Sequence, residues 1–352
     1  MRKNQENTSN FLSISTISDS IIPIFSDSII PIFIVLILLF TMNFENLYPT
    51  SFSRLESISE HKYQEQKIDL ISQCENKTKS PVYHYQLAVA SIFKDEAPYL
   101  KEWVEFHLMI GVEQFYLFNN LSSDNYLEIL KPYIDQKIVQ LIDWPYVSQN
   151  LKDWNPIQCQ AYEHALNLSR GVAKWVAFID IDEYLFPIDN DNLVNVLSNY
   201  EEFPGVAVNW VMFGTSWVSK IPEKELLIQA LILRGQDSLK DNTFVKSIIQ
   251  PIYVQECTNP HFFIYPSQLF QVNTDKIPFQ GLTSPYFVKN KIRINHYWGR
   301  DEQFLNNVKI PRHKKWYDDS SNVIFNNKLY NQVEDSTILR FVPSLRKRMG
   351  YD

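Results

Sequence analysis

Short apolar runs that alternate with stretches of helical spacing limit the folds open to this chain of 352 residues. The runs are rich in β-branched and aromatic residues, as strands are, and they occupy residues 86–93, 114–119, 137–143 and 174–180. Between the first two runs, Leu100, Trp103 and Val104 recur at helical spacing, so we expect a helix there. Two more helices are expected, one from its N-cap Asp124 through Leu130 and one over residues 156–168. This alternation predicts an α/β domain built on a parallel sheet.

The second half of the chain alternates less regularly. We expect a strand over residues 205–214, a helix over 223–233, and further strands over 243–249, 268–272 and 291–297. We take residues 86–340 as one domain. The last segment, residues 341–352, contains Arg346, Lys347 and Arg348 and is interpreted as a solvated basic tail.

The N-terminal segment is polar at first and then apolar, which sets it apart from the domain. Residues 29–42 carry no charge, and a helix that starts near Ser28 would be just long enough to span a bilayer. We therefore interpret residues 1–45 as a disordered tail with a single-pass membrane anchor, and residues 46–85 as a stem. A secretory signal peptide is the alternative, and the side of the membrane stays open.

Polar clusters follow the apolar runs at the points where strands would end. Asp180 and Asp182 come directly after a strongly apolar run, and Glu96 and Asn119 follow the first two runs. Ligands of α/β sheets gather at the carboxyl ends of strands. Two carboxylates that point the same way repel each other unless a cation joins them, and Mg²⁺ and Mn²⁺ prefer oxygen ligands. A solvated acidic turn is the alternative, but the position after a buried strand favours a metal site.

Several other classes of protein are not supported by the sequence. The chain has only eight glycines and contains no GxxxxGK[ST], GxGxxG, GxSxG or HExxH motif. A net charge of −7 argues against a nucleic-acid partner. The three cysteines are far apart and form no CxxC pattern, which gives neither a zinc site nor a disulfide framework and leaves the redox compartment open.

Four segments together resemble glycosyltransferase family 92 and the related family 2-like enzymes. They are residues 90–124 (ASIFKDEAPYLKEWVEFHLMIGVEQFYLFNNLSSD), 175–187 (WVAFIDIDEYLFP), 208–217 (VNWVMFGTSW) and 294–304 (INHYWGRDEQF). The resemblance implies a single GT-A domain of the α/β class that binds a nucleotide-diphosphate sugar at its strand ends. The chain departs from the family pattern at Gly299, Arg300 and Asp301, where a Lys-Ser pair is expected.

The resemblance also implies roles for individual residues. The metal ligands would be Asp180, Asp182 and His296. The nucleotide and its diphosphate would be held by Glu96, Asn119, Asp124, Asp180, Lys246 and Arg300. Trp210, Phe213 and Gly214 would shape a sugar pocket, with core packing as the alternative. The candidates for the catalytic base are Asp301, Glu302 and Glu183, and the sequence does not rank them.

The expected function is therefore metal-dependent sugar transfer at a membrane. A Mn²⁺ or Mg²⁺ ion would assist the transfer of a sugar, with galactose as the candidate, from a UDP-sugar to a hydroxyl of a glycan or other acceptor. The resemblance suggests inversion at the anomeric carbon. The alternative is a membrane-tethered carbohydrate-binding protein with an inactive GT-A fold, and a metal-dependent nucleotidyltransferase is a third hypothesis.

Overall fold

The computed structural model describes residues 82–266, 269–317 and 321–351. The expected anchor and nearly all of the expected stem lie outside the described residues. Within the described ranges, none of the helices combines the length and the apolar character needed to cross a bilayer. The described residues belong to one compact unit, which spans Lys79–Asp352.

A large mixed sheet runs through this unit. Its strands lie in the order β3-β2-β1-β4-β8-β6-β12-β5, and a short strand, β11 (Val272–Asn273), pairs with β6. The first half is parallel, as predicted: β1 (Tyr85–Phe93), β2 (Gln114–Asn119), β3 (Val139–Asp143) and β4 (Ala173–Phe178).

The second half of the sheet, where the alternation in the sequence is less regular, mixes parallel and antiparallel strands. The strand β8 (Val245–Ile249) lies antiparallel between β4 and β6 (Gly205–Met212). β12 (Ile292–His296) is parallel to β6 but antiparallel to β5 (Glu183–Pro187). The expected strand over residues 268–272 is reduced to β11 in the described part.

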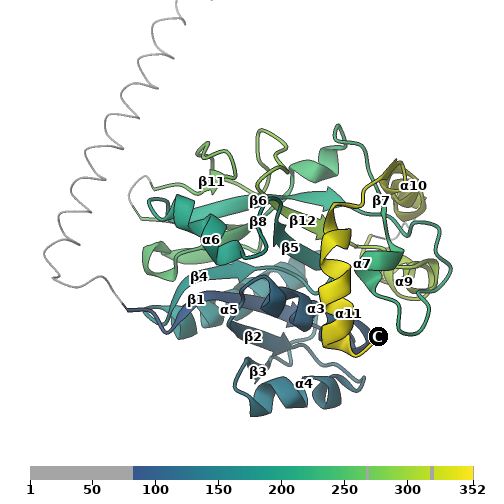
Figure 1. Cartoon of the computed structure of the whole chain (residues 1–352), viewed down its shortest axis with the longest axis horizontal. Helices are drawn as coiled ribbons and strands as arrows, with labels where there is room; N and C mark the ends of the chain where they lie inside the picture. The colour runs from purple at the N-terminus through teal and green to yellow at the C-terminus, as the bar shows by residue number, and fades with distance from the viewer. Residues whose placement is uncertain (1–81, 267–268, 318–320, 352) are drawn as a thin grey trace, which may run out of the picture. The chain divides into compact units, whose positions relative to one another are not determined.

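Helices cover both faces of the parallel half (Figure 1). Alternate residues of a strand point to opposite faces, and β1 follows this rule. Leu87 and Val89 pack in the apolar cluster of the helix α3 (Ala97–Met109), while Ala88 and Ala90 pack in that of α5 (Leu151–Ser169). The central strands are therefore buried on both sides, which explains their nearly continuous apolar sequences.

Three helix boundaries differ from the predictions. The helix α5 begins at Leu151, five residues before the expected start, because the Asn150 side chain accepts hydrogen bonds from the N–H groups of Lys152 and Asp153. The helix expected over residues 223–233 is only α7 (Leu227–Ala230), and the short strand β7 (Leu233–Arg234) follows it.

The third difference concerns Asp124, which was predicted to cap its own helix. That helix, α4 (Tyr126–Asp135), has Asn125 at its N-cap position. The Asp124 carboxylate accepts a long hydrogen bond of 3.4 Å from the N–H of Tyr126, the first residue of α4, and a shorter one of 2.8 Å from the N–H of Ala97, the first residue of α3. Asp124 therefore joins the loops that follow β1 and β2.

The predicted basic tail is a packed helix, α11 (Val342–Met349), followed by a left-handed Gly350. Its Leu345 and Met349 are buried, and Arg348 pairs with Glu105 of α3 at 2.8 Å. Figure 1 shows α11 in yellow beside α3. The prediction was wrong because it weighed the charges and not the apolar pair four residues apart.

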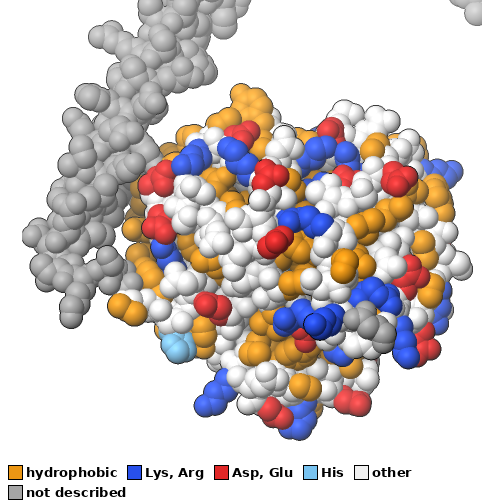
Figure 2. Space-filling model, viewed as in Figure 1, with side chains coloured by type: hydrophobic (Ala, Val, Ile, Leu, Met, Phe, Trp, Pro, Cys, Tyr) orange, Lys and Arg blue, Asp and Glu red, His pale blue; other side chains and the backbone are white. Residues whose placement is uncertain are grey.

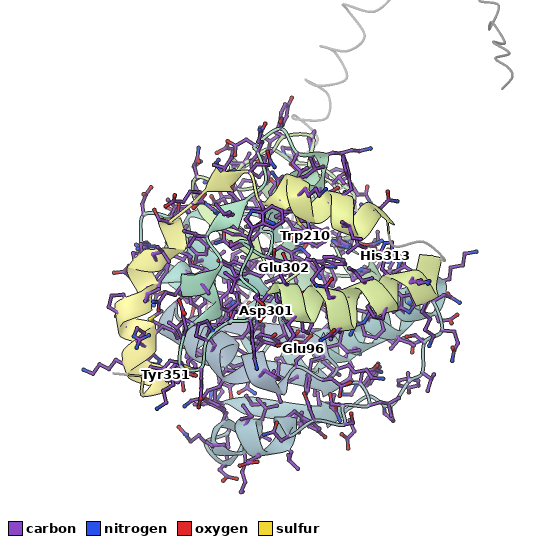
Figure 3. The ribbon with its side chains drawn as sticks, turned by 90° about the vertical axis from the view of Figure 1, so that its right-hand side faces the viewer. Glu96, Trp210, Asp301, Glu302, His313 and Tyr351 are labelled. Atoms are coloured by element: carbon purple, nitrogen blue, oxygen red, sulfur yellow. The ribbon has the colours of Figure 1, made fainter. Side chains whose placement is uncertain are left out.

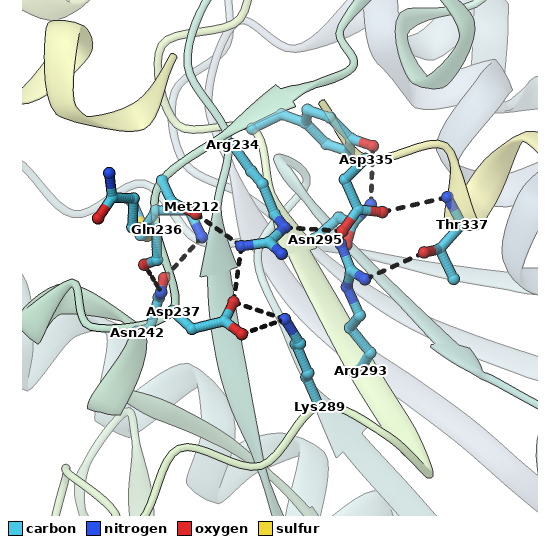
Figure 4. A network of polar contacts seen from close by, with 12 residues as sticks. Met212, Arg234, Gln236, Asp237, Asn242, Lys289, Arg293, Asn295, Asp335 and Thr337 are labelled. Carbon is cyan, nitrogen blue, oxygen red and sulfur yellow. Dashed lines mark hydrogen bonds and ion pairs between the residues drawn. The ribbon is translucent and has the colours of Figure 1, made fainter. Parts of the chain in front are cut away.

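A buried polar network joins the C-terminal part to the sheet (Figure 4). The Asp335 carboxylate accepts from Arg234 at 2.7 Å and forms an ion pair with Arg293 of β12 at 2.9 Å. Burial raises the pKa of Asp335, but Arg293 and Thr337 outweigh this effect and hold the pKa below its ordinary value.

On the face drawn in Figure 2, acidic and basic side chains are interspersed with apolar ones.

Candidate active site

Strands from both halves of the sheet end at one cavity of about 890 Å³. This volume is in the range of ligand-binding cavities. The residues after β1, β2, β4 and β12 and the end of β6 line it, as do the start of β8 and the helix α9 (Ile310–Tyr317). The lining residues used below are Glu96, Asn120, Asp180, Asp182, Trp210, Asp241, Lys246, His296, Lys309, Arg312 and Lys315.

Asp180 lies in a turn after β4 and is held by three side chains. Its Oδ2 accepts from the Lys246 ammonium at 2.9 Å, while Oδ1 accepts from Gln158 at 2.9 Å and from the Tyr162 hydroxyl at 3.4 Å. Lys246 is 1% exposed. Burial lowers the pKa of Lys246, but Asp180 and Glu183 outweigh it and hold the pKa above the ordinary value.

Asp182 lies between a cation and an imidazole. Its Oδ2 accepts from the Lys309 ammonium at 2.9 Å, and its Oδ1 is 3.5 Å from Nε2 of His296. Burial raises the pKa of Asp182, but Lys309 and His296 together outweigh it and hold the pKa well below its usual range. The Asp182 carboxylate is therefore ionised at neutral pH and faces the cavity.

The donor set at Asp182 and His296 fits a divalent cation. The two side chains converge from separate strand ends, and Mg²⁺ is commonly held by one or two carboxylates together with substrate phosphates. Within the part of the chain that the structure describes, no group of three His, Cys, Asp or Glu residues forms a complete protein cage. Asp180, which was predicted as the third ligand, is turned toward Lys246 and Gln158.

Glu96 lines the cavity, but Arg300 lies behind it. The Arg300 guanidinium pairs with the Glu96 carboxylate and stacks on the rings of Tyr99 at 3.7 Å and Phe304 at 4.6 Å. Arg300 is 0% exposed and is absent from the cavity wall. A direct contact between Arg300 and a diphosphate does not fit this placement, so we correct its role to positioning Glu96.

Asn119 and Asp124 organise loops and do not line the cavity. The Asn119 side chain donates to the hydroxyl of Tyr126 at 2.9 Å and accepts from the N–H of Ser122 at 3.0 Å. The neighbouring Asn120 lines the cavity instead. The sequence motif indicated this loop but not which of its two adjacent amides lines the cavity.

The three predicted candidates for the catalytic base all lie away from the cavity. Asp301 caps the short helix α8 (Glu302–Phe304), where it accepts from the N–H of Phe304 at 2.8 Å. Glu302 accepts from Thr215 and Asn327. Glu183 is 0% exposed and accepts from the N–H of Asp180 at 2.9 Å. Figure 3 labels Asp301 and Glu302 together with three cavity residues, Glu96, Trp210 and His313.

Of the predicted sugar-binding residues, only Trp210 lines the cavity. Its ring packs on the imidazole of His296, with ring centroids 4.4 Å apart. Phe213 is 0% exposed and packs on Tyr297. A Cβ on Gly214 would come within 2.4 Å of Asn331, so this glycine serves a close approach in the core. Core packing thus accounts for Phe213 and Gly214.

Two groups of cavity residues were not found from the sequence. Asp241, in the 3-10 turn η2 (Lys240–Thr243), accepts from the Tyr330 hydroxyl at 2.6 Å. Lys309 and Arg312 come from the π-helical turn η4 (Leu305–Lys309) and from α9. No motif marks Asp241, but basic residues three apart at positions 309 and 312 were a visible signal.

Comparison with known proteins decides the family. The model of glycosyltransferase family 92 matches residues 84–338. The chain belongs to glycosyltransferase family 92. The matched range of this family 92 protein includes every cavity residue discussed above.

Curated relatives match only in part. A family 92 protein of Oryza sativa subsp. japonica is 30% identical over 143 residues, which cover 40% of this chain and 23% of the relative. One from Arabidopsis thaliana is 26% identical over 196 residues (51% and 33%). Galactan beta-1,4-galactosyltransferase GALS2 of Arabidopsis thaliana is 22% identical over 132 residues (36% and 25%). The family 92 protein thus matches between 23% and 33% of the length of these relatives.

Two solved structures resemble parts of this chain at low identity and low TM-scores. S. aureus TarS in complex with UDP-GlcNAc is 12% identical, covers 75% of this chain and 72% of its own, and has a TM-score of 0.35. Glucosyl-3-phosphoglycerate synthase from Mycobacterium tuberculosis, with Mn²⁺ and UDP, is 12% identical (48% and 58%), with a TM-score of 0.27. At these scores the likeness carries no argument about ligands.

Proposed function

We propose that this family 92 protein is a GT-A glycosyltransferase that moves a sugar from a UDP-sugar to a hydroxyl of a glycan or other acceptor. The observation that carries the proposal is the group of Asp182, His296 and Lys309 on the wall of a ligand-sized cavity. A carboxylate, an imidazole and an ammonium at one edge of a sheet suit a diphosphate and its cation. Trp210 adds an aromatic face beside them.

We propose that Asp182 and His296 hold Mn²⁺ or Mg²⁺. When bound, the ion supplies positive charge that stabilises the departing diphosphate. The side chains of this chain do the rest of the positioning. Lys309 and Trp210 fix the orientations of Asp182 and His296, respectively. Lys246 and Gln158 hold Asp180, whose carboxylate also lines the cavity and is proposed to contact the nucleotide.

Asp241 is the proposed base. A proton taken by Glu96, Asp180 or Asp182 would leave a buried cation without its counter-charge, namely Arg300, Lys246 or Lys309. The partner of Asp241 is the neutral hydroxyl of Tyr330. Among the described carboxylates on the cavity wall, Asp241 therefore accepts a proton at the lowest electrostatic cost.

The proposed reaction is a single displacement with inversion. The acceptor oxygen forms a bond to the anomeric carbon while the bond from that carbon to the β-phosphate oxygen breaks. The hydroxyl proton passes to Asp241, and UDP leaves with the electron pair. Galactose is the first donor sugar to test, because one relative is named as a galactosyltransferase.

We also propose that residues 1–45 tether the protein to a membrane as a single-pass anchor, which resistance to alkaline extraction would test.

The test uses the purified protein with Mn²⁺ and a panel of UDP-, GDP- and CMP-sugars. We expect one UDP-sugar to raise the melting temperature and, with a glycan acceptor, to release UDP. Asp182→Ala and the closer mimic Asp182→Asn should abolish both effects while the circular dichroism spectrum is unchanged. Full turnover in both variants would overturn the proposal. Sugar binding without turnover on any acceptor would favour the carbohydrate-binding alternative.

A further inference from the structure

The segment formed by η4 and α9 lines the cavity with basic side chains. Lys309, Arg312 and Lys315 lie on the cavity wall, whereas the exposed Lys314 of the same helix does not. His313, labelled in Figure 3, lies on the wall as well. Lys94 and Lys246 also line the cavity, but Lys309, Arg312 and Lys315 come from one short continuous stretch.

Lys309 of this stretch pairs with Asp182, but Arg312 and Lys315 have no carboxylate partner in the part of the chain that the structure describes. Glu96, Asp180 and Asp182 each have a cation already, as described above. Within the described residues, neither Arg312 nor Lys315 forms an ion pair with a carboxylate. Among the described residues, these two cations thus have no carboxylate within 4 Å, which is the arrangement expected of an anion-binding wall.

Repulsion between neighbours supports this interpretation. Lys309 and Arg312 are three residues apart and lie on the same cavity wall, so their positive charges are held near each other. Like charges held together destabilise each other, and a bound anion relieves the repulsion. An anion with two or more charges would relieve it most.

The backbone of the segment is also unusual. Five residues, Leu305–Lys309, form a π-helical turn before α9 begins at Ile310. Such turns are rare and are frequent at functional sites. Here the turn ends at Lys309, whose ammonium reaches Asp182 at 2.9 Å and lies 4.9 Å from the ring centroid of Trp298. Lys309 is thereby occupied, and Arg312 is left for a ligand.

We propose that the η4–α9 segment binds the diphosphate of the donor and of the departing nucleotide, with Arg312 as the principal contact and Lys315 as the second. The proposal rests on the proposed function, since the diphosphate is that of the nucleotide sugar. The planar guanidinium of Arg312 matches two phosphate oxygens at once, which an ammonium cannot do. The sequence predicted that Lys246 and Arg300 would contact the diphosphate. In this proposal, Arg312 and Lys315 take the place of Arg300 and act together with Lys246.

The test measures binding of uridine, UMP, UDP and inorganic pyrophosphate by calorimetry with Mg²⁺ present. The wild-type chain should bind UDP more tightly than UMP and uridine. Arg312→Gln should weaken UDP and pyrophosphate about tenfold or more, while uridine affinity is unchanged. Lys315→Gln should weaken UDP less, and Arg312→Lys should lie between Arg312→Gln and the wild type. Lys314→Gln is the matched control and should bind all four as the wild type does.

Two results would separate the ideas being tested. If the wild-type chain binds UDP and Arg312→Gln binds it equally well, the inference about the wall is overturned and the proposed function stands. If the wild-type chain binds neither nucleotides nor pyrophosphate, the proposed function itself fails. Loss of an anionic acceptor alone, with UDP affinity kept, would also overturn the inference. Equal melting temperatures of variant and wild type exclude misfolding as the cause of a loss.

Discussion

At the scale of single residues, the carboxylates on the cavity wall differ in the charge of the groups that they contact. Three have cationic partners and are proposed to bind ligands or to position other groups, whereas Asp241 has the hydroxyl of Tyr330. The partner of a carboxylate therefore decides its chemistry more than its place in a motif does. The sequence motifs directed attention to Asp301, which is a helix cap.

The first prediction concerns Asp241→Asn. The amide keeps the shape of the side chain but cannot take the acceptor proton, so kcat should fall by roughly 10²–10⁴ with KM for the donor little changed. Steady-state kinetics with the preferred UDP-sugar measures both constants. Asp275→Asn, which removes an exposed ion pair with Lys291, is the control and should leave both unchanged. A kcat within twofold of the wild type would rule out Asp241 as the base.

At the scale of elements, α11 shows how charge can hide packing in a sequence. The helix packs on α3 through Leu345 and Met349, and the ammonium of Lys101 donates to the carbonyl of Met349 at 3.2 Å. α3 in turn begins at the loop that bears Glu96. The C-terminal helix thus packs against α3, the helix that begins directly after the cavity residue Glu96.

The second prediction compares two substitutions in α11. Leu345→Ala leaves a cavity at a fully buried position and should lower the free energy of unfolding by roughly 2–5 kcal/mol. Lys347→Ala alters an exposed position of the same helix and should change it by less than about 0.5 kcal/mol. Urea unfolding followed by circular dichroism gives both values. Equal, small effects would show that α11 does not contribute to stability.

At the scale of the whole molecule, Glu102 joins the two halves of the fold. It lies in α3, 7% exposed, and its carboxylate accepts from the N–H groups of Leu227 at 2.8 Å and Ile228 at 3.2 Å in α7. Burial raises the pKa of Glu102 to about 7, and the two backbone hydrogen bonds offset this only in part. The joint between α3 and α7 is therefore sensitive to pH.

The third prediction follows from the sign of this shift. A pKa that is higher in the folded than in the unfolded chain gives stability that is full below about pH 4.5 and is lost as pH rises through about 7. The loss should be roughly 3 kcal/mol at most. Urea unfolding of the wild type and of Glu102→Gln across this range measures it, and the free energy of unfolding of the wild type minus that of the variant should fall as pH rises, because only the wild type gains a buried charge. Buried His107 titrates in both proteins and cancels in the difference.

A difference between the two proteins that is constant with pH would contradict the assignment to Glu102. A wild type that gains stability relative to Glu102→Gln as pH rises would show that the N–H groups of Leu227 and Ile228 favour the ionised carboxylate over the protonated one. Either result would mean that the joint between α3 and α7 is better solvated than its burial indicates.

The sequence by itself determined the parallel half of the sheet and the edge where ligands would gather. Those features depend on local periodicity, because alternation along a strand and spacing along a helix are written in neighbouring residues. The position of Asp182 after β4 and of His296 at the end of β12 was predictable for the same reason. The family resemblance added His296 as a candidate metal ligand. The structure places its Nε2 atom 3.5 Å from the Asp182 carboxylate.

Only the tertiary structure decided the rest. The antiparallel insertion of β8 and the pairing of β5 with β12 depend on contacts between distant segments, which local pattern does not encode. The same holds for which polar side chains reach the cavity: Asn120 and not Asn119, and Arg312 and not Arg300. Adjacent residues point in different directions once the backbone turns, and burial is settled by what packs against them from elsewhere in the chain.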